Sequence, residues 1–291
     1  MPDDPDVSIV LPTYNGSRYI EQSIRSCLDQ THRDIELIIV DDCSTDATPQ
    51  IIARFIAEDP RVRTIRHDPN RRLPASLNSG FAASRGRYLT WTSDDNLYRP
   101  DAIAQMLSVL EQKPEVGLVY TPMTYIDPDG RPIGPGCSGG PPDTLAYRDP
   151  VGACFLYRRE VYETIGNYAE DLFLVEDWDY WIRVAEKFRM HVLPKDLYLY
   201  RLHNESLSRQ KQENHKLVSR KLLEHHLPRM HWVSPASKGH GYLVAARIAW
   251  GFGDRKDALK HLKRAFSYSP TYTLLRLAGE PLDRLLKRRG R

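Results

Sequence analysis

What the sequence lacks removes several classes of protein. None of its 291 residues belongs to an unbroken run of the about 18 apolar residues that a membrane-spanning helix needs. The longest candidate, residues 243–252, is interrupted by Arg247. Residues 1–6 are acidic and have no apolar core, so we expect no signal peptide. These absences predict a soluble chain.

Cysteine is scarce, and the net charge is small. The chain has four cysteines without metal-type spacing, which fits a reducing compartment better than a disulfide framework, and we therefore expect a cytoplasmic location. The net charge of +3 does not favour a nucleic-acid partner. Hydrophobic residues make up 41% and charged residues 27%, as in a globular protein. The cysteines are Cys27, Cys43, Cys137 and Cys154.

The first 56 residues follow a β-α-β-α pattern. The apolar runs at 7–11 and 35–40 predict strands, and apolar residues at helical spacing in 20–28 and 51–56 predict helices. Because neither run alternates with polar residues, both strands are expected to be covered on both faces, as in a parallel sheet. No G-x-G-x-x-G follows the first strand, which disfavours hydride-transfer enzymes.

An acidic corner follows a third predicted strand, residues 88–91. Ser93, Asp94, Asp95 and Asn96 stand between this strand and an amphipathic helix. Open α/β sheets bind ligands at the carboxyl ends of their strands, and carboxylates are suitable ligands for Mg²⁺ or Mn²⁺. The alternative is a helix-capping turn, because Asp and Asn favour such turns.

Four segments taken together resemble family 2 glycosyltransferases with the GT-A fold. The resemblance covers about residues 6–205 and implies a Rossmann-like, mostly parallel α/β sheet flanked by helices. It assigns residues 1–205 to a catalytic domain, with nucleotide binding in 6–100 and the acceptor side in 101–205. The family's metal motif is often Asp-any-Asp, and here its first position is Ser93. The matching segments are residues 8–15, 40–46, 93–96 and 175–181.

The resemblance implies a divalent cation, Mn²⁺ or Mg²⁺. It makes Asp95 the direct metal ligand and places Asp94 against the ribose or the donor sugar. His203 matches a position that contacts metal or phosphate in many GT-A enzymes, and an imidazole ligand would favour Mn²⁺. The alternative for His203 is a surface histidine in a polar loop.

Asp177 matches the family's catalytic base. A carboxylate near the acceptor hydroxyl can take its proton as it attacks, and direct attack inverts the anomeric centre. Glu176 and Asp177 also suit the first turn of a helix, whose N-terminus favours acidic side chains, and both interpretations can hold together.

The resemblance also implies a donor site for a nucleotide sugar, with UDP favoured and dTDP next. Asp41 would accept a hydrogen bond from the pyrimidine N3–H, and Asp42 would orient its loop. Residues 70–80 match the next nucleotide-facing segment, in which a guanidinium can pair with diphosphate oxygens. The remaining donor-site candidates are Pro12, Thr13, Tyr14, Asn15, Arg72 and Asn78.

Two segments outside the motifs carry further expectations. Residues 127–142 are dense in Gly and Pro, which predicts a loop that closes over the donor or frames the acceptor, or else a disordered surface insertion. Residues 206–291 are predicted to be a helical appendage with one tetratricopeptide-like hairpin. The basic, leucine-rich stretch 274–291 predicts either peripheral contact with the inner face of the membrane or a packed terminal helix.

The expected reaction is sugar transfer to a hydroxyl of a saccharide or of a lipid-linked glycan acceptor. Two alternatives remain at this point. A nucleotidyltransferase also uses such a sheet, although its usual Gly-rich basic loop is missing from residues 12–16. A module that binds nucleotide sugars without catalysis is the other alternative, against which intact Asp95 and Asp177 argue.

Overall fold

The computed structural model describes residues 4–136, 138–204, 206 and 212–279. The chain forms two compact units. The first, here called the sheet unit, comprises Met1–Pro142 and Pro150–Gln210. The second, the helical unit, comprises Asp143–Asp149 and Lys211–Arg291. Residue 205, where the sequence predicts a domain boundary, lies outside the described residues.

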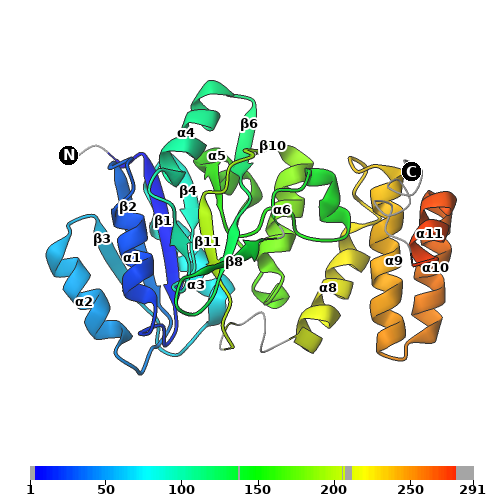
Figure 1. Ribbon diagram of the computed structural model, residues 1–291, viewed down its shortest axis with the longest axis horizontal. Helices are drawn as coiled ribbons and strands as arrows, with labels where there is room; N and C mark the ends of the chain where they lie inside the picture. The colour runs from blue at the N-terminus through cyan, green and yellow to red at the C-terminus, as the bar shows by residue number, and fades with distance from the viewer. Residues whose placement is uncertain (1–3, 137, 205, 207–211, 280–291) are drawn as a thin grey trace. The chain divides into compact units, whose positions relative to one another are not determined.

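The sheet unit contains a seven-stranded sheet in the order β10-β6-β9-β4-β1-β2-β3 (Figure 1). β1 is parallel to β2 and β4, β2 is parallel to β3, and β10 is parallel to β6. Only β9 runs antiparallel to its neighbours β4 and β6. The prediction of a mostly parallel α/β sheet is therefore confirmed. The strands are β1 (Val7–Thr13), β2 (Ile35–Asp41), β3 (Val62–Arg66), β4 (Tyr88–Trp91), β6 (Val116–Tyr120), β9 (Phe155–Arg158) and β10 (Arg189–Val192).

Helices cover both faces of this sheet, which explains why its central strands show no alternation. Ile9 of β1 belongs to the buried cluster that includes Ile20 and Ile24 of α1. Val10, the next residue, points to the other face, where a Cβ on Gly80 of α3 would lie 2.4 Å from it. Only glycine allows α3 to approach β1 so closely. The flanking helices are α1 (Ile20–Leu28), α2 (Thr48–Glu58), α3 (Arg72–Ala83), α4 (Ala102–Gln112), α5 (Arg159–Ile165) and α6 (Glu176–Lys187).

A second, smaller sheet has the order β5-β11-β7-β8. β5 (Leu97–Tyr98) pairs antiparallel with β11 (Tyr198–Arg201), and β11 is parallel to β7 (Thr124–Ile126). β8 (Pro132–Pro135) forms a hairpin with β7, so part of the predicted Gly/Pro-rich loop is a strand. The turn between them forms because the Asp127 carboxylate accepts hydrogen bonds from the backbone N–H groups of Asp129 and Arg131.

The helical unit consists of α8 (Gln212–His226), α9 (Pro235–Gly251), α10 (Arg255–Tyr268) and α11 (Pro270–Leu277). α9 and α10 run side by side (Figure 1). Alanines are buried on both helices. This is the hairpin that the alanine spacing predicts. Among the described helices, none has both the length and the apolarity that crossing a bilayer requires. The buried alanines are Ala245, Ala246, Ala249, Ala258 and Ala265.

Candidate active site

The polar segments that follow β1, β2 and β4 meet at the carboxyl edge of the main sheet. β1, β2 and β4 are adjacent parallel strands, so their carboxyl ends lie at the same edge. The Thr13 hydroxyl donates to the Asp94 carboxylate over 2.5 Å, and the Asp42 N–H donates to the Thr13 carbonyl over 2.8 Å. Segments about 30 and 80 residues apart in sequence are thus joined by direct hydrogen bonds.

Asp94 is held in a tight, desolvated position. A Cβ on Gly16 would lie 2.1 Å from the Asp94 Oδ2 atom and 2.6 Å from the Thr13 hydroxyl, so only glycine fits at residue 16. Burial, reinforced by the neighbouring charge of Asp95, raises the pKa of Asp94 above its ordinary value. A bound cation, or hydrogen-bond donors of a bound ligand, would stabilise the negative charge of Asp94 and so favour its ionised form.

Asp95 and His203 face each other. The His203 Nε2 and Asp95 Oδ2 atoms are 2.9 Å apart. The antiparallel pairing of β5 with β11 brings the two side chains together. In its register, Tyr198 lies opposite Tyr98, so residues that follow Tyr198 lie beside residues that precede Tyr98. The Arg201 N–H donates to the Asn96 side chain over 2.8 Å, which continues the pairing beyond the strands.

Both side chains also have polar atoms without hydrogen-bond partners. The Asp95 Oδ1 and His203 Nδ1 atoms are buried and unpaired. Such atoms are costly unless a ligand satisfies them, and a carboxylate with an imidazole suits Mn²⁺ or Mg²⁺ chemistry. Among the described residues, no group of three or more His, Cys, Asp or Glu side chains could hold a metal ion by itself. A cation bound by Asp95 and His203 would therefore take further ligands from a diphosphate and water.

Arg201, which sequence reasoning missed, braces this corner. Its side chain is 1% exposed and donates to the Asp95 carbonyl at 2.9 Å, the Pro128 carbonyl at 2.9 Å and the Gln22 side chain at 2.8 Å. Its guanidinium also lies 4.5 Å from the ring centre of Tyr19. One side chain thus fixes the backbone of the metal-binding candidate against α1 and the β7–β8 turn. The only sequence signal was an arginine two residues before His203.

The carboxylates at the end of β2 have different partners. Asp41 is ion-paired with Arg66 of β3 and accepts from the Ser44 N–H at 2.9 Å. Asp42 accepts from the N–H groups of Arg71 at 2.8 Å and Arg72 at 2.7 Å. Asp42 therefore orients the loop before α3, whereas the sequence suggested that it orients its own loop after β2. The Arg66 partner of Asp41 was not predicted.

The loop after β1 presents the other donor-site candidates. Asn15 has a positive φ of 54°; its N–H donates to the Ser44 hydroxyl and its side chain accepts from the Thr45 N–H. This fastens the β1 loop to the β2 loop. Tyr14 is 55% exposed, so its ring is accessible to a base, and Pro12 is buried within the end of β1.

Arg72 and Asn78 connect α3 to the segment before α6. Both polar atoms of the Asn78 amide bond to the backbone of Tyr168, at 2.8 and 3.0 Å. The exposed Arg72 guanidinium lies 5.5 Å from the Phe173 ring centre. These contacts place the chain leading to Asp177 along α3, the helix that starts at the carboxyl edge of the sheet. The role of Asn78 and Arg72 toward a donor stays a prediction.

Asp177 lies in the first turn of α6 beside a buried glutamate. Its carboxylate accepts from the Trp178 N–H at 2.7 Å. Glu176 is 3% exposed and accepts from the Leu174 N–H at 2.6 Å. Burial, followed by the charge of Asp177, raises the pKa of Glu176 to about 8. Glu176 is therefore protonated at neutral pH.

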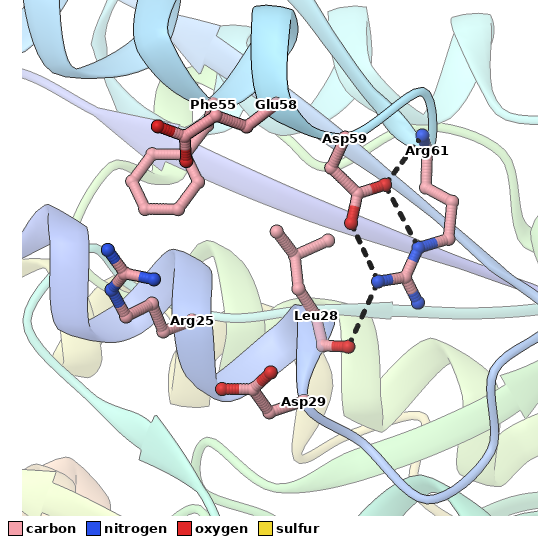
Figure 2. Close-up of a pocket in the computed structure, with 7 residues that line it drawn as sticks. All are labelled: Arg25, Leu28, Asp29, Phe55, Glu58, Asp59 and Arg61. Atoms are coloured by element: carbon pink, nitrogen blue, oxygen red, sulfur yellow. Dashed lines mark hydrogen bonds and ion pairs between the residues drawn. The ribbon is translucent and has the colours of Figure 1, made fainter.

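A pocket of about 220 Å³ lies elsewhere on the sheet unit (Figure 2). It is located where α1 and α2 end, whereas the acidic corners follow the carboxyl ends of the strands. Arg61 donates across it to Asp59 and to the Leu28 carbonyl. None of the predicted site residues lines it. Its lining is Arg25, Leu28, Asp29, Phe55, Glu58, Asp59 and Arg61.

Comparison with known proteins decides the family. The glycosyl transferase family 2 model matches residues 8–166, more than half of the chain. The chain is a family 2 glycosyltransferase. The putative teichuronic acid biosynthesis glycosyltransferase TuaG of Bacillus subtilis is 27% identical over 71% of this chain and 83% of its own. The putative glycosyltransferase EpsE of the same organism is 31% identical over 70% and 76%. Chondroitin synthase of Escherichia coli is 30% identical over 75% of this chain, which spans 33% of that longer protein.

Solved structures confirm the GT-A fold. S. aureus TarS 1–349 in complex with UDP-GlcNAc has a TM-score of 0.66 at 16% identity, over 92% of this chain and 82% of that one. The mannosyltransferase PcManGT from Pyrobaculum calidifontis, in complex with GDP-Man and Mn²⁺, has a TM-score of 0.62 at 18% identity, over 99% and 80%. The resemblance to family 2 glycosyltransferases and the fold that it implied are therefore confirmed.

Proposed function

We propose that this enzyme moves a sugar from a nucleotide-diphosphate donor to a hydroxyl of a saccharide or of a lipid-linked glycan, with inversion at the anomeric carbon. A UDP sugar is the favoured donor and a dTDP sugar the next. The UDP-GlcNAc complex of TarS supports UDP, whereas GDP-Man in PcManGT keeps a purine donor in the test. The names of TuaG and chondroitin synthase support a polysaccharide acceptor.

Asp95 and His203 would hold a divalent cation, and their buried unpaired atoms are the observation that carries the proposal. Mn²⁺ or Mg²⁺, when bound, stabilises the negative charge that develops on the leaving diphosphate. Asp94, which accepts a hydrogen bond from the Thr13 hydroxyl, would accept further hydrogen bonds from ribose or sugar hydroxyls. Tyr14, Asn15 and Asp41 would receive the base and ribose.

Asp177 would take the proton of the acceptor hydroxyl as its oxygen attacks the anomeric carbon. The neighbouring Glu176 is neutral at pH 7 and is therefore a poor proton acceptor, so we assign the role of base to Asp177. The start of a helix is a rigid position for such a base, and its dipole favours the carboxylate before the proton arrives. Attack by the acceptor without a covalent sugar–enzyme intermediate gives inversion.

Donor binding and turnover test the proposal separately. UDP, dTDP, GDP and CMP sugars are titrated into the protein by calorimetry with Mn²⁺, with Mg²⁺ and with EDTA. We expect binding of a UDP sugar that EDTA abolishes and that Asp95→Asn loses. The metal role would be contradicted if the wild type and Asp95→Asn bound the UDP sugar with equal affinity, and if EDTA did not change that affinity. Binding without turnover on any glycan acceptor would favour the non-catalytic module.

A cytoplasmic location remains part of the proposal. It is tested by fractionating cells that express the tagged chain, with recovery in the periplasmic or extracellular fraction as the contradicting result. The membrane contact suggested by the basic tail concerns residues 274–291, of which residues 280–291 lie outside the described residues. Deleting them and measuring vesicle binding tests that suggestion directly.

A further inference from the structure

The outward stripe of α10 in the helical unit carries a row of lysines. Lys256, Lys260 and Lys263 recur at i, i+4 and i+7, so they lie on one face of the helix, and all three are exposed. Five of the fourteen residues of α10 are Lys or Arg, and Asp257 is its single acid. The opposite stripe is buried and consists of Ala258, His261 and Ala265.

Large apolar side chains border this lysine row. Leu259 of α10 is 53% exposed, and Trp250 and Phe252 at the end of α9 are 55% and 41% exposed. The Arg255 guanidinium lies 4.4 Å from the centre of the Trp250 ring, and Leu259 follows Arg255 by one helical turn. Trp250, Arg255 and Leu259 therefore form a continuous flank beside the lysines.

The acids of the same hairpin do not neutralise the row. Asp254 and Asp257 both accept from the Arg220 guanidinium, at 2.9 and 2.6 Å. Arg220 belongs to α8, so both carboxylates are paired with a guanidinium that lies outside the lysine row. Among the described residues, the ion pairs of this unit leave out all three lysines of the row. The face consequently combines uncompensated positive charge with exposed apolar groups.

We propose that this face binds the surface of an anionic phospholipid bilayer. It is called the α10 face and consists of Trp250, Leu259, Lys256, Lys260 and Lys263. A bilayer surface offers negative headgroups and an apolar layer in one plane, which is the pairing that these side chains can match. The indole edge and the leucine enter the headgroup region, while the lysines stay at the level of the phosphates. The inference does not depend on sugar transfer.

Vesicle co-sedimentation of the full chain tests the α10 face. The vesicles contain phosphatidylcholine alone or phosphatidylcholine with phosphatidylglycerol, and no sugar nucleotide is present. Because a lysine near an anionic surface contributes about fivefold to partitioning, the triple change of Lys256, Lys260 and Lys263 to Gln should weaken binding about 100-fold. A matched control makes the same charge change at exposed lysines elsewhere, namely Lys187, Lys195 and Lys216.

The two outcomes are distinct. Binding that needs phosphatidylglycerol, that weakens with salt, and that falls in the α10 triple variant and in Trp250→Ser but not in the control supports the proposal. The proposal is overturned if the α10 triple variant and the control variant bind the vesicles equally. This holds whether or not deletion of residues 280–291 changes vesicle binding. The proposal would also be overturned if the α10 triple variant differed from the wild type in oligomeric state, measured by sedimentation, but not in vesicle binding. That result would identify a second copy of the chain as the partner of the α10 face.

Discussion

Replacing Arg201 should weaken metal-dependent donor binding, although Arg201 is not proposed to touch the metal or the donor. Its guanidinium holds the Asp95 backbone by a 2.9 Å hydrogen bond and anchors it to Pro128 and Gln22. Lysine keeps the charge but has a single nitrogen in place of the planar fork. Arg201→Lys therefore retains at most part of the brace, and Arg201→Met removes it.

The size of the effect on folding follows from these bonds. Three hydrogen bonds from a charged donor contribute about 1.5–3 kcal/mol each. Burial opposes them, since it lowers the pKa of Arg201 and so disfavours its charged form. Removing one partner of a buried charged network typically costs about 3–5 kcal/mol, which we expect for Arg201→Met. Arg201→Lys should cost about 1–3 kcal/mol, because one or two of the bonds can re-form.

The effect on the site should exceed what lost stability explains. Loss of a residue that orients a metal ligand typically costs about 10- to 100-fold in metal affinity or activity. Arg158→Lys is the matched control, because Arg158 also donates to backbone carbonyls, those of Val116 and Leu110. Arg158 pairs with Tyr88, which begins β4, whereas Asp95 follows the other end of that strand. Arg158 is therefore remote from the proposed metal site.

The assay is UDP binding as a function of Mn²⁺ concentration, at a temperature where both variants remain folded by circular dichroism. Arg201→Lys should need about 10- to 100-fold more Mn²⁺ than the wild type, and Arg158→Lys should need the same amount as the wild type. An unchanged Mn²⁺ requirement in Arg201→Lys, or an equal increase in both variants, would refute the bracing role.

Three further results are expected. Asp177→Asn should leave UDP-sugar affinity nearly intact and lower kcat by about 10²- to 10⁴-fold. Glu176→Gln resembles the neutral acid and should keep most of the turnover at pH 7. A larger loss of kcat in Glu176→Gln than in Asp177→Asn would make Glu176 the base. Gly16→Ala should destabilise the fold by about 1–3 kcal/mol and weaken donor binding, since its Cβ would collide with Asp94, and wild-type affinity in calorimetry would contradict this. Burial lowers the pKa of His240 to about 4. As the pH falls below about 6.5, the unfolded chain therefore takes up a proton at this residue before the folded chain does. The free energy of unfolding should consequently fall by about 1–2 kcal/mol between pH 7 and pH 5. Urea denaturation of His240→Gln should show a flatter pH profile over this range, and an unchanged profile would count against the effect.

Sequence patterns predicted the parts of the fold that are determined locally. The strands at 7–13 and 35–41 are recognisable because they are buried on both faces and therefore lack alternation. The seam of α1 is recognisable because its buried residues recur at helical spacing. The polar residues that follow these strands then meet, because parallel neighbours end at the same edge.

Long-range pairing accounts for what sequence reasoning missed. Arg201 reaches Asp95 only because β11 pairs with β5, which lies about 100 residues earlier in the chain. Arg66 reaches Asp41 only because β3 is the edge neighbour of β2. β8 lies in a segment whose glycines and prolines favour a loop, and it becomes a strand because an edge position tolerates proline.

We propose that Asp95 and His203 hold a divalent cation against the diphosphate of the donor. Crystals grown with Mn²⁺ and UDP, measured at a wavelength where manganese scatters anomalously, test it directly. We expect one anomalous peak at coordination distance from the Asp95 carboxylate and the His203 imidazole, with diphosphate oxygens completing the shell. A manganese peak bound by other residues, or UDP bound with no manganese between it and Asp95, would contradict the claim.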